Sequence, residues 1–135
     1  MYEEIMCRCV DLMAENNNKE AELLLNGCIL KIKENIQKGI AEMESFYAWG
    51  MCLSILEEYE QAILKFEKVL DYNSNHEEAL WQITDILFYH LGKAKTAQVI
   101  LEEKLTKLNP GNSTYQKTLR DIQSYLSRET NRKSG

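Results

Sequence analysis

Cysteine and histidine, the side chains that most often hold metals or act as nucleophiles and bases, are few in this chain. The four cysteines are Cys7, Cys9, Cys28 and Cys52, and none belongs to a CxxC motif. Cys7 and Cys9 are two positions apart, so on a helix they point to nearly opposite sides and cannot hold one metal ion. Cys9, Cys28 and Cys52 fall where small core residues fit on a helix. We therefore expect free thiols packed in a core, no metal, and a reducing cytosol.

The remaining candidates for catalysis form no constellation. His76 and His90 lie 14 positions apart, in or near expected loops, where we expect them to be exposed to solvent. The sequence contains no HExxH, no GxSxG and no glycine-rich phosphate loop. The Glu57-Glu58 and Glu102-Glu103 pairs are adjacent and are expected on solvated surfaces. We therefore expect a protein that is not an enzyme and that needs no cofactor.

Length and charge limit the remaining function classes. The chain has 135 residues, which suits one domain, and a net charge of −5, which disfavours a general nucleic-acid binder. Residues 1–92 carry a net charge of −10, whereas residues 93–135 carry +5. Only Tyr115 lies near the basic residues as a stacking platform, so we expect no nucleic-acid partner. The uneven charge either orients a charged partner or reflects solvated faces of opposite sign.

The N-terminus and the hydropathy pattern bear on location. The first residues, Met1-Tyr2-Glu3-Glu4, are acidic where a signal peptide would be basic, and no long apolar run follows them. No stretch approaches the roughly 18 apolar residues that a membrane span needs. We expect a cytoplasmic protein with no membrane partner.

The elements that must position any functional side chain are helices. The chain contains only 1 Pro and 6 Gly, so turns are few and elements are long, which argues against a sandwich or barrel. Apolar residues recur at helical spacing, and no run of alternating residues is long enough for a sheet. The pattern predicts an all-α protein with seven helices in antiparallel hairpins and a disordered polar tail at 128–135. The predicted helices span about 2–15, 19–38, 40–56, 60–72, 76–91, 93–108 and 113–127.

Large and small residues in the middle of the chain follow a repeat-like spacing. The segment Phe46-x2-Trp49-Gly50-x2-Leu53 is followed by Ala62-x3-Phe66 and then by Ser74. Every spacing equals that of the tetratricopeptide repeat, so residues 43–76 resemble one such repeat. Weaker copies read Leu80-x2-Ile83-Thr84-x2-Leu87, Ala97-x3-Leu101 and Pro110 downstream, and Ile5-x2-Arg8-Cys9-x2-Leu12 and Ala21-x3-Leu25 upstream.

The resemblance implies an architecture. Three helix hairpins, at about 2–38, 43–76 and 77–110, would stack into a right-handed α-solenoid, and a helix at about 113–127 would cap it as part of one domain of residues 1–127. The third copy has one extra residue near its turn at 90–92, since Ala62 and Ala97 are 35 positions apart. Gly50 and Ala62 would be small because two helices cross there, which predicts that Ala62 is nearly fully buried. Phe66 would fill the space against the next repeat.

In this family the inner helices line a concave groove that usually holds a peptide. The resemblance places twelve residues in that groove: Glu3, Met6, Val10, Met13, Glu44, Tyr47, Met51, Ser54, Glu78, Trp81, Asp85 and Phe88. The set is apolar, aromatic and rich in methionine, with a glutamate at the same end of each helix. None of the twelve is Lys, Arg or Asn, which disfavours the clamp that some family members use for acidic chaperone tails.

The groove composition suggests a function. Flexible methionines and aromatic anchors suit an extended apolar segment of another protein, and the glutamates would favour a basic flank on it. We therefore expect an adaptor or chaperone, with Tyr47 and Trp81 side by side as anchors. Small bacterial secretion chaperones with three repeats have a similar architecture. Alternatively, Met6 and Met13 pack against the protein's own helices, or the groove is filled by its own chain or another copy in a structural homo-oligomer.

Overall fold

The computed structural model describes residues 2–134, with side chains up to residue 132, and these residues form helices and no strands. The prediction of an all-α fold is therefore confirmed. The α-helices are α1 Glu3–Ala14, α2 Asn18–Gln37, α3 Glu42–Ile55, α4 Tyr59–Tyr72, α5 Glu77–Asp85, α6 Ala94–Ile100, α7 Thr106–Leu108 and α8 Ser113–Ser134. Two π-helical segments, η1 Ile86–His90 and η2 Leu101–Leu105, continue α5 and join α6 to α7. Counted as continuous stretches, the helices of the described residues number seven.

The C-terminal helix differs from the prediction. It was expected to end near 127 and to be followed by a disordered tail, but α8 continues to Ser134. No glycine or proline interrupts residues 128–134, and Arg132 and Glu129 form an ion pair of 3.6 Å one turn apart. The Thr130 hydroxyl donates to the Leu126 carbonyl at 3.0 Å, which also satisfies a polar side chain within the helix. Local polarity therefore does not end this helix.

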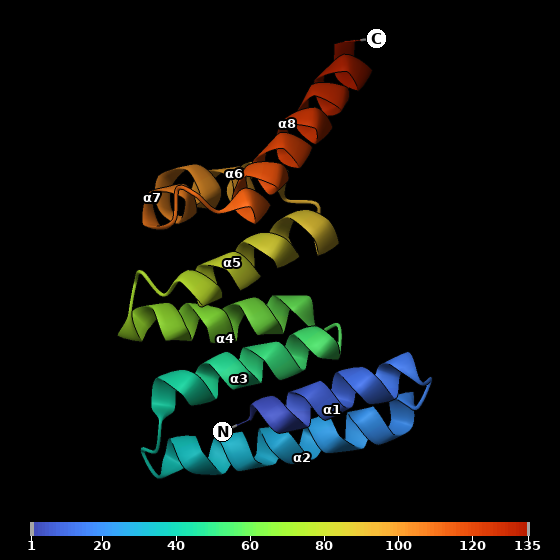
Figure 1. Ribbon diagram of the computed structural model, residues 1–135, viewed down its shortest axis with the longest axis vertical. Helices are drawn as coiled ribbons and strands as arrows, with labels where there is room; N and C mark the ends of the chain where they lie inside the picture. The colour runs from blue at the N-terminus through green and yellow to red at the C-terminus, as the bar shows by residue number, and fades with distance from the viewer. Residues whose placement is uncertain (1, 135) are drawn as a thin grey trace. The chain divides into compact units, whose positions relative to one another are not determined.

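The chain divides into two compact units, Met1–Tyr72 and Asn73–Gly135. We refer to them as the N-terminal unit and the C-terminal unit. In the N-terminal unit, α1 pairs with α2, α2 with α3, and α3 with α4, each antiparallel to the one before (Figure 1). In the C-terminal unit, α6 contacts both α5 and α8, and the last turns of α8 extend past the other helices of that unit (Figure 1).

The helices of the N-terminal unit end in the same way. Asn16, Gly39 and Glu57 follow the C-caps of α1, α2 and α3 with positive φ angles of 65°, 70° and 63°. At each end, the amide of this residue bonds a carbonyl three positions back, and the next amide bonds one five positions back. This pair of bonds is the Schellman motif, which satisfies the last carbonyls of a helix and reverses the chain. The three short connections therefore follow from local backbone hydrogen bonding.

The core of the N-terminal unit confirms the tight helix crossing that was predicted. Ala62 is 0% exposed, as is Phe66. A Cβ atom at Gly50 would lie 2.7 Å from the Phe66 ring, closer than non-bonded carbons tolerate. Glycine at position 50 therefore lets the aromatic ring lie directly on the backbone of α3.

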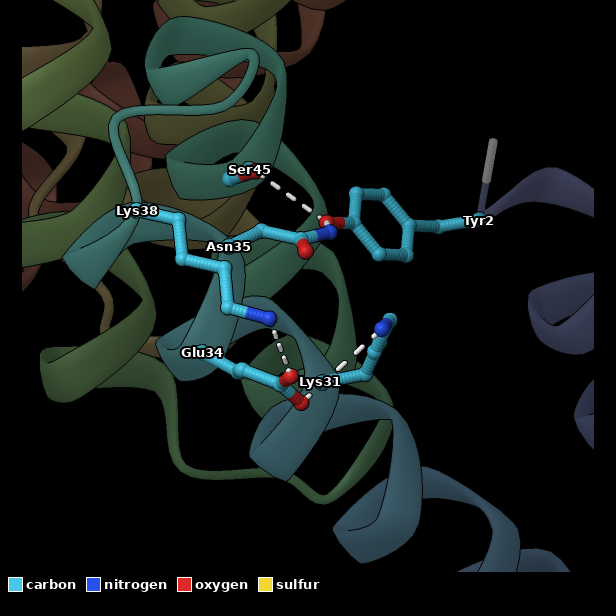
Figure 2. Close-up of polar contacts among 6 residues, drawn as sticks. All are labelled: Tyr2, Lys31, Glu34, Asn35, Lys38 and Ser45. Atoms are coloured by element: carbon cyan, nitrogen blue, oxygen red, sulfur yellow. Dashed lines mark hydrogen bonds and ion pairs between the residues drawn. The ribbon is translucent and has the colours of Figure 1, made fainter.

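A buried polar cluster joins the first three helices of this unit (Figure 2). The Tyr2 hydroxyl accepts a hydrogen bond from the Asn35 amide at 2.7 Å and lies 3.1 Å from the Ser45 hydroxyl. All three side chains are buried. Because each has a partner, the cluster avoids the cost of an unsatisfied buried polar group. Beside it, Glu34 pairs on the surface with Lys31 and Lys38 (Figure 2).

The C-terminal unit is less regular. His76, which was expected to be exposed near a loop, accepts a hydrogen bond from the Ala79 amide through Nδ1 at 3.1 Å and so caps α5. His90 is exposed, as predicted. The core of this unit includes Ile86, Leu101 and Ile122, each 0% exposed. No helix in residues 2–134 is long and apolar enough to cross a membrane.

Candidate functional site

The predicted groove residues of α1 lie mostly in solvent. Val10 is 55% exposed and Met13 37% exposed, and Glu3 is also exposed. Met6 is partly buried and packs against the core of the N-terminal unit, so for this residue the self-packing alternative holds. Met13 borders a small cavity of about 230 Å³ whose other walls come from α2 and from the end of α3.

The predicted residues of α3 are partly buried, except for Glu44, which is exposed. The Tyr47 ring lies 5.5 Å from the Phe66 ring at 57°, a tilted arrangement that aromatic pairs favour. The Phe66 ring thus packs against the Tyr47 ring and restricts its orientation. Met51 and Ser54 continue the same row along the helix.

The predicted residues of α5 and η1 lie at positions i, i+3, i+7 and i+10, which share one helix face. Glu78, at the start of the row, is exposed, and Trp81, Asp85 and Phe88 are partly buried. Helix α8 covers part of this face with aromatic rings. Tyr115 lies 5.3 Å from Trp81, and Tyr125 meets Phe88 edge-on at 5.9 Å.

At the Phe88 end of this row, a cleft of about 1030 Å³ opens between η1 and α8. Phe88 and Tyr89 form one wall, with ring centroids 4.7 Å apart, and Tyr125 belongs to the other wall. Tyr89 is 49% exposed and donates its hydroxyl hydrogen to Asp121 Oδ2 at 3.1 Å. The cleft is therefore aromatic on both sides, and the Tyr89–Asp121 hydrogen bond links η1 to α8.

Arginine side chains add positive charge to the cleft. Arg120 and Arg128 both line it from α8. Arg128 Nε donates to the Ser124 carbonyl at 3.4 Å, a contact within the helix. Neither arginine forms an ion pair with any residue from 2 to 132.

The two consecutive aromatic residues of this cleft, Phe88 and Tyr89, lie in the π-helical segment η1. The Leu91 amide bonds the Ile86 carbonyl, five residues back, and the Lys93 amide bonds Leu87. A π-turn accommodates one more residue than an α-turn, and such turns are common at functional sites. The extra residue that the sequence shows between Ala62 and Ala97 has a structural counterpart here, slightly before the predicted position at 90–92.

Burial shapes the electrostatics of the same face. Burial raises the pKa of Asp85, and the nearby His90 opposes that rise. Burial, followed by the charge of Glu77, raises the pKa of Tyr115 to about 12. Burial is also the main reason that the pKa of Tyr89 is raised. Both tyrosines therefore keep their hydroxyl hydrogens at neutral pH.

The cysteines form no comparable site. Cys9, Cys28 and Cys52 belong to the core of the N-terminal unit, as predicted, and Cys7 is exposed. A hydrogen bond between the Cys28 and Cys52 thiols raises the pKa of Cys52, and burial adds to that rise. Within residues 2–132, no group of three or more metal-binding side chains could hold an ion.

Sequence reasoning missed most of the cleft. Phe88 was predicted as a groove residue, but Tyr89, Arg120, Tyr125 and Arg128 were not. The available signal was the basic charge of the C-terminal region, which had been predicted only as a capping helix with a polar tail. Neither protein-family models nor curated proteins match this chain, so its chemistry must be inferred from these residues alone.

Proposed function

We propose that this protein is a non-enzymatic interaction module that binds an extended, largely apolar peptide segment of another protein. The observation that carries the proposal is the cleft at Phe88, where a residue of the predicted groove meets Tyr89 and Tyr125. Partly exposed aromatic rings that are already held in place bind partners at a low entropic cost. The cleft, of about 1030 Å³, is open to solvent along one side and is therefore accessible to a peptide.

The row on α5 and η1 suggests how such a segment is oriented. Glu78 lies ten positions before Phe88, a rise of about 15 Å along a helix. An extended peptide covers this distance with four or five residues. A basic residue of the partner near Glu78 would then be four or five positions from the side chain that enters the cleft.

The proposed architecture is a stack of three tetratricopeptide hairpins in a right-handed solenoid, in one cytoplasmic domain. The close contact of Phe66 with Gly50 and the burial of Ala62 support this assignment for the second hairpin. The adaptor or chaperone role, and the side-by-side placement of Tyr47 and Trp81, belong to the same proposal.

A structural role is the alternative. Trp81 is partly covered by Tyr115, so the chain itself fills some of the predicted surface. The exposed Val10 and Met13 on α1 offer apolar area to another copy of the chain. In that case the protein would form a homo-oligomer through these surfaces.

Selection from a peptide display library on the full chain tests the proposal. Enriched peptides should be extended and apolar, and Trp81→Ala should weaken their binding by about 2 kcal/mol, as truncation of an anchor residue does. Phe88→Ala should have a similar effect. Val99→Ala, which removes an exposed side chain elsewhere in the C-terminal unit, is the matched control and should bind normally.

Two results would contradict the proposal. One is that no peptide is enriched above background. The other is that enriched peptides bind the Trp81 and Phe88 variants as tightly as the parent protein. Sedimentation at several concentrations distinguishes the alternative, because a homo-oligomer would dissociate on dilution.

A further inference from the structure

We infer that the cleft between η1 and α8 recognises an acidic peptide segment, in which an apolar or aromatic residue lies between two carboxylates. This inference rests on the proposed function and specifies the partner at the Phe88 end of the surface. The carboxylates would bind Arg120 and Arg128, and the apolar side chain would lie against Phe88 and Tyr125.

The first observation is that, among the described residues, neither arginine has a carboxylate partner, although Arg128 Nε donates to the Ser124 carbonyl. Among residues 2–132 neither forms an ion pair, although Arg132 on the same helix pairs with Glu129 at 3.6 Å. The one carboxylate that lines the cleft, Asp121, accepts the hydroxyl hydrogen of Tyr89. The guanidinium groups are therefore available to an external anion.

The second observation is that the positive charge of the protein is concentrated in the C-terminal unit and on α8. Residues 1–72 carry 7 basic and 14 acidic side chains, whereas residues 73–135 carry 9 basic and 7 acidic ones. Helix α8 itself has five basic and two acidic residues. In a protein with a net charge of −5, this helix is a positive exception, and it would attract an acidic segment.

The third observation is the combination of groups in the cleft. An arginine presents a planar fork of donors that binds a carboxylate through two parallel hydrogen bonds. Both arginines are exposed, and the aromatic walls beside them offer an apolar surface for the side chain between two carboxylates. Phe88 and Tyr125, which meet edge-on at 5.9 Å, supply this surface.

Spacing on α8 defines the segment more closely. Arg120 and Arg128 are eight positions apart, which places them on one helix face at a separation of about 12 Å. An extended peptide spans that distance with three or four residues, so two acidic residues at this spacing would reach both arginines. The side chain between them would then face the aromatic walls.

Synthetic peptides test the inference on the full chain. The probe is a labelled nine-residue peptide whose central phenylalanine has a glutamate two positions away on each side. Its binding is compared by fluorescence anisotropy with that of a peptide carrying glutamine at both positions. We expect the glutamate peptide to bind at least about tenfold more tightly, with an advantage that shrinks as salt is added.

Variants of the protein locate the effect. Arg120→Gln with Arg128→Gln should abolish the preference for glutamate, and lysine at both positions should restore only part of it, because an ammonium group lacks the fork geometry. Arg132→Gln removes an arginine of α8 that lies outside the cleft and should leave the preference intact. Thermal unfolding by circular dichroism verifies that each variant is folded.

The remaining outcomes separate this inference from the proposed function. If the two peptides bind equally well and Phe88→Ala weakens both, the carboxylate inference is wrong and peptide binding stands. If neither peptide nor any display-selected peptide binds, both are wrong. If the double arginine variant instead loses a concentration-dependent self-association of the parent protein, a second copy occupies the cleft and the inference is overturned.

Discussion

The N-terminal unit and the C-terminal unit are both built from antiparallel helices, but they depart from regularity to different degrees. The N-terminal unit ends its first three helices with one and the same hydrogen-bonding motif. The C-terminal unit contains two π-helical segments and a terminal helix of 22 residues. Its cleft opens beside the first of these π-helical segments. The candidate site therefore lies where the helix geometry is disturbed.

The two units also treat polar groups differently. In the N-terminal unit, Tyr2, Asn35 and Ser45 satisfy one another inside the protein. In the C-terminal unit, Arg120 and Arg128 remain at the cleft without an internal carboxylate partner. Satisfied buried groups specify packing, whereas unpaired charges beside a cleft are suited to an external ligand. If this division is real, substitutions in the N-terminal unit should change stability, whereas substitutions at the cleft should change binding.

Disrupting the contact between Phe66 and Gly50 should cause the largest loss of stability. Phe66→Ala removes a fully buried ring and should lower the free energy of unfolding by about 3–5 kcal/mol. Gly50→Ala should cost about 1–3 kcal/mol alone, because the new Cβ meets the ring. In the Phe66→Ala background the same change should cost much less. Urea unfolding measures all three, and equal costs of Gly50→Ala in both backgrounds would contradict the packing described for this unit.

Removing the Tyr2 hydroxyl tests how much the buried polar cluster contributes to stability. Tyr2→Phe leaves the Asn35 amide and the Ser45 hydroxyl without this partner and should lower the free energy of unfolding by about 1–3 kcal/mol. Tyr72→Phe is the matched control, because its hydroxyl bonds Glu42 on the surface and its loss should cost less than about 0.5 kcal/mol. Equal effects of the two changes would show that the cluster adds nothing to the stability of the N-terminal unit.

Replacing Asp85 should raise the stability of the protein, unlike the substitutions above, because the charge of this carboxylate is partly buried. Its pKa is raised by burial, so the folded state binds a proton more readily than the unfolded state and stability falls as pH rises through that range. Asp85→Asn should therefore raise the melting temperature at pH 7. The gain should vanish as pH falls below about 4, the ordinary pKa of an aspartate.

Melting curves from about pH 3 to pH 8 provide the measurement for Asp85. Asp11→Asn, at an exposed position of α1, controls for the loss of one negative charge. A lower melting temperature for Asp85→Asn at pH 7 would mean that attraction to His90 outweighs the cost of burial. The charge of Asp85 would then be compensated within the C-terminal unit, as the polar groups of the N-terminal unit are.

The reactivity of the four thiols should distinguish the surface from the core of the N-terminal unit, and this test needs no substitution. Under native conditions, alkylation should modify Cys7 rapidly and Cys9, Cys28 and Cys52 only after unfolding. Intact mass spectrometry without reduction should show four reduced cysteines. Rapid modification of more than one thiol, a stoichiometric disulfide or bound zinc would contradict the closed core of the N-terminal unit.

Apolar periodicity was sufficient to predict the helices, because each helix must turn one face toward a neighbour. Gly50, Ala62 and Phe66 also identified the tightest crossing, since small and large residues at fixed spacing have few other uses. Cys9, Cys28 and Cys52 were recognised as core residues for the same reason. These features depend on neighbours along a single helix or within a single hairpin.

The cleft could not be predicted in this way. Residues 86–90 and 120–128 are about thirty positions apart, and no local pattern indicates that their aromatic side chains meet. The one-residue excess in the third hairpin was visible, but its conversion into a π-turn depends on how η1 packs against the helices around it. The Tyr2 cluster likewise joins residues 33 and 43 positions apart.

The sequence alone was thus enough to predict an all-helical chain, most of its connections and the burial of Cys9, Cys28 and Cys52, because periodicity, glycine and small side chains act locally. The tertiary structure was needed to show that Phe88 and Tyr89 face α8 and that Arg120 and Arg128 line the space between. Contacts of that kind depend on where distant helices cross. Such crossings are set by side-chain packing throughout each unit and not by any single segment.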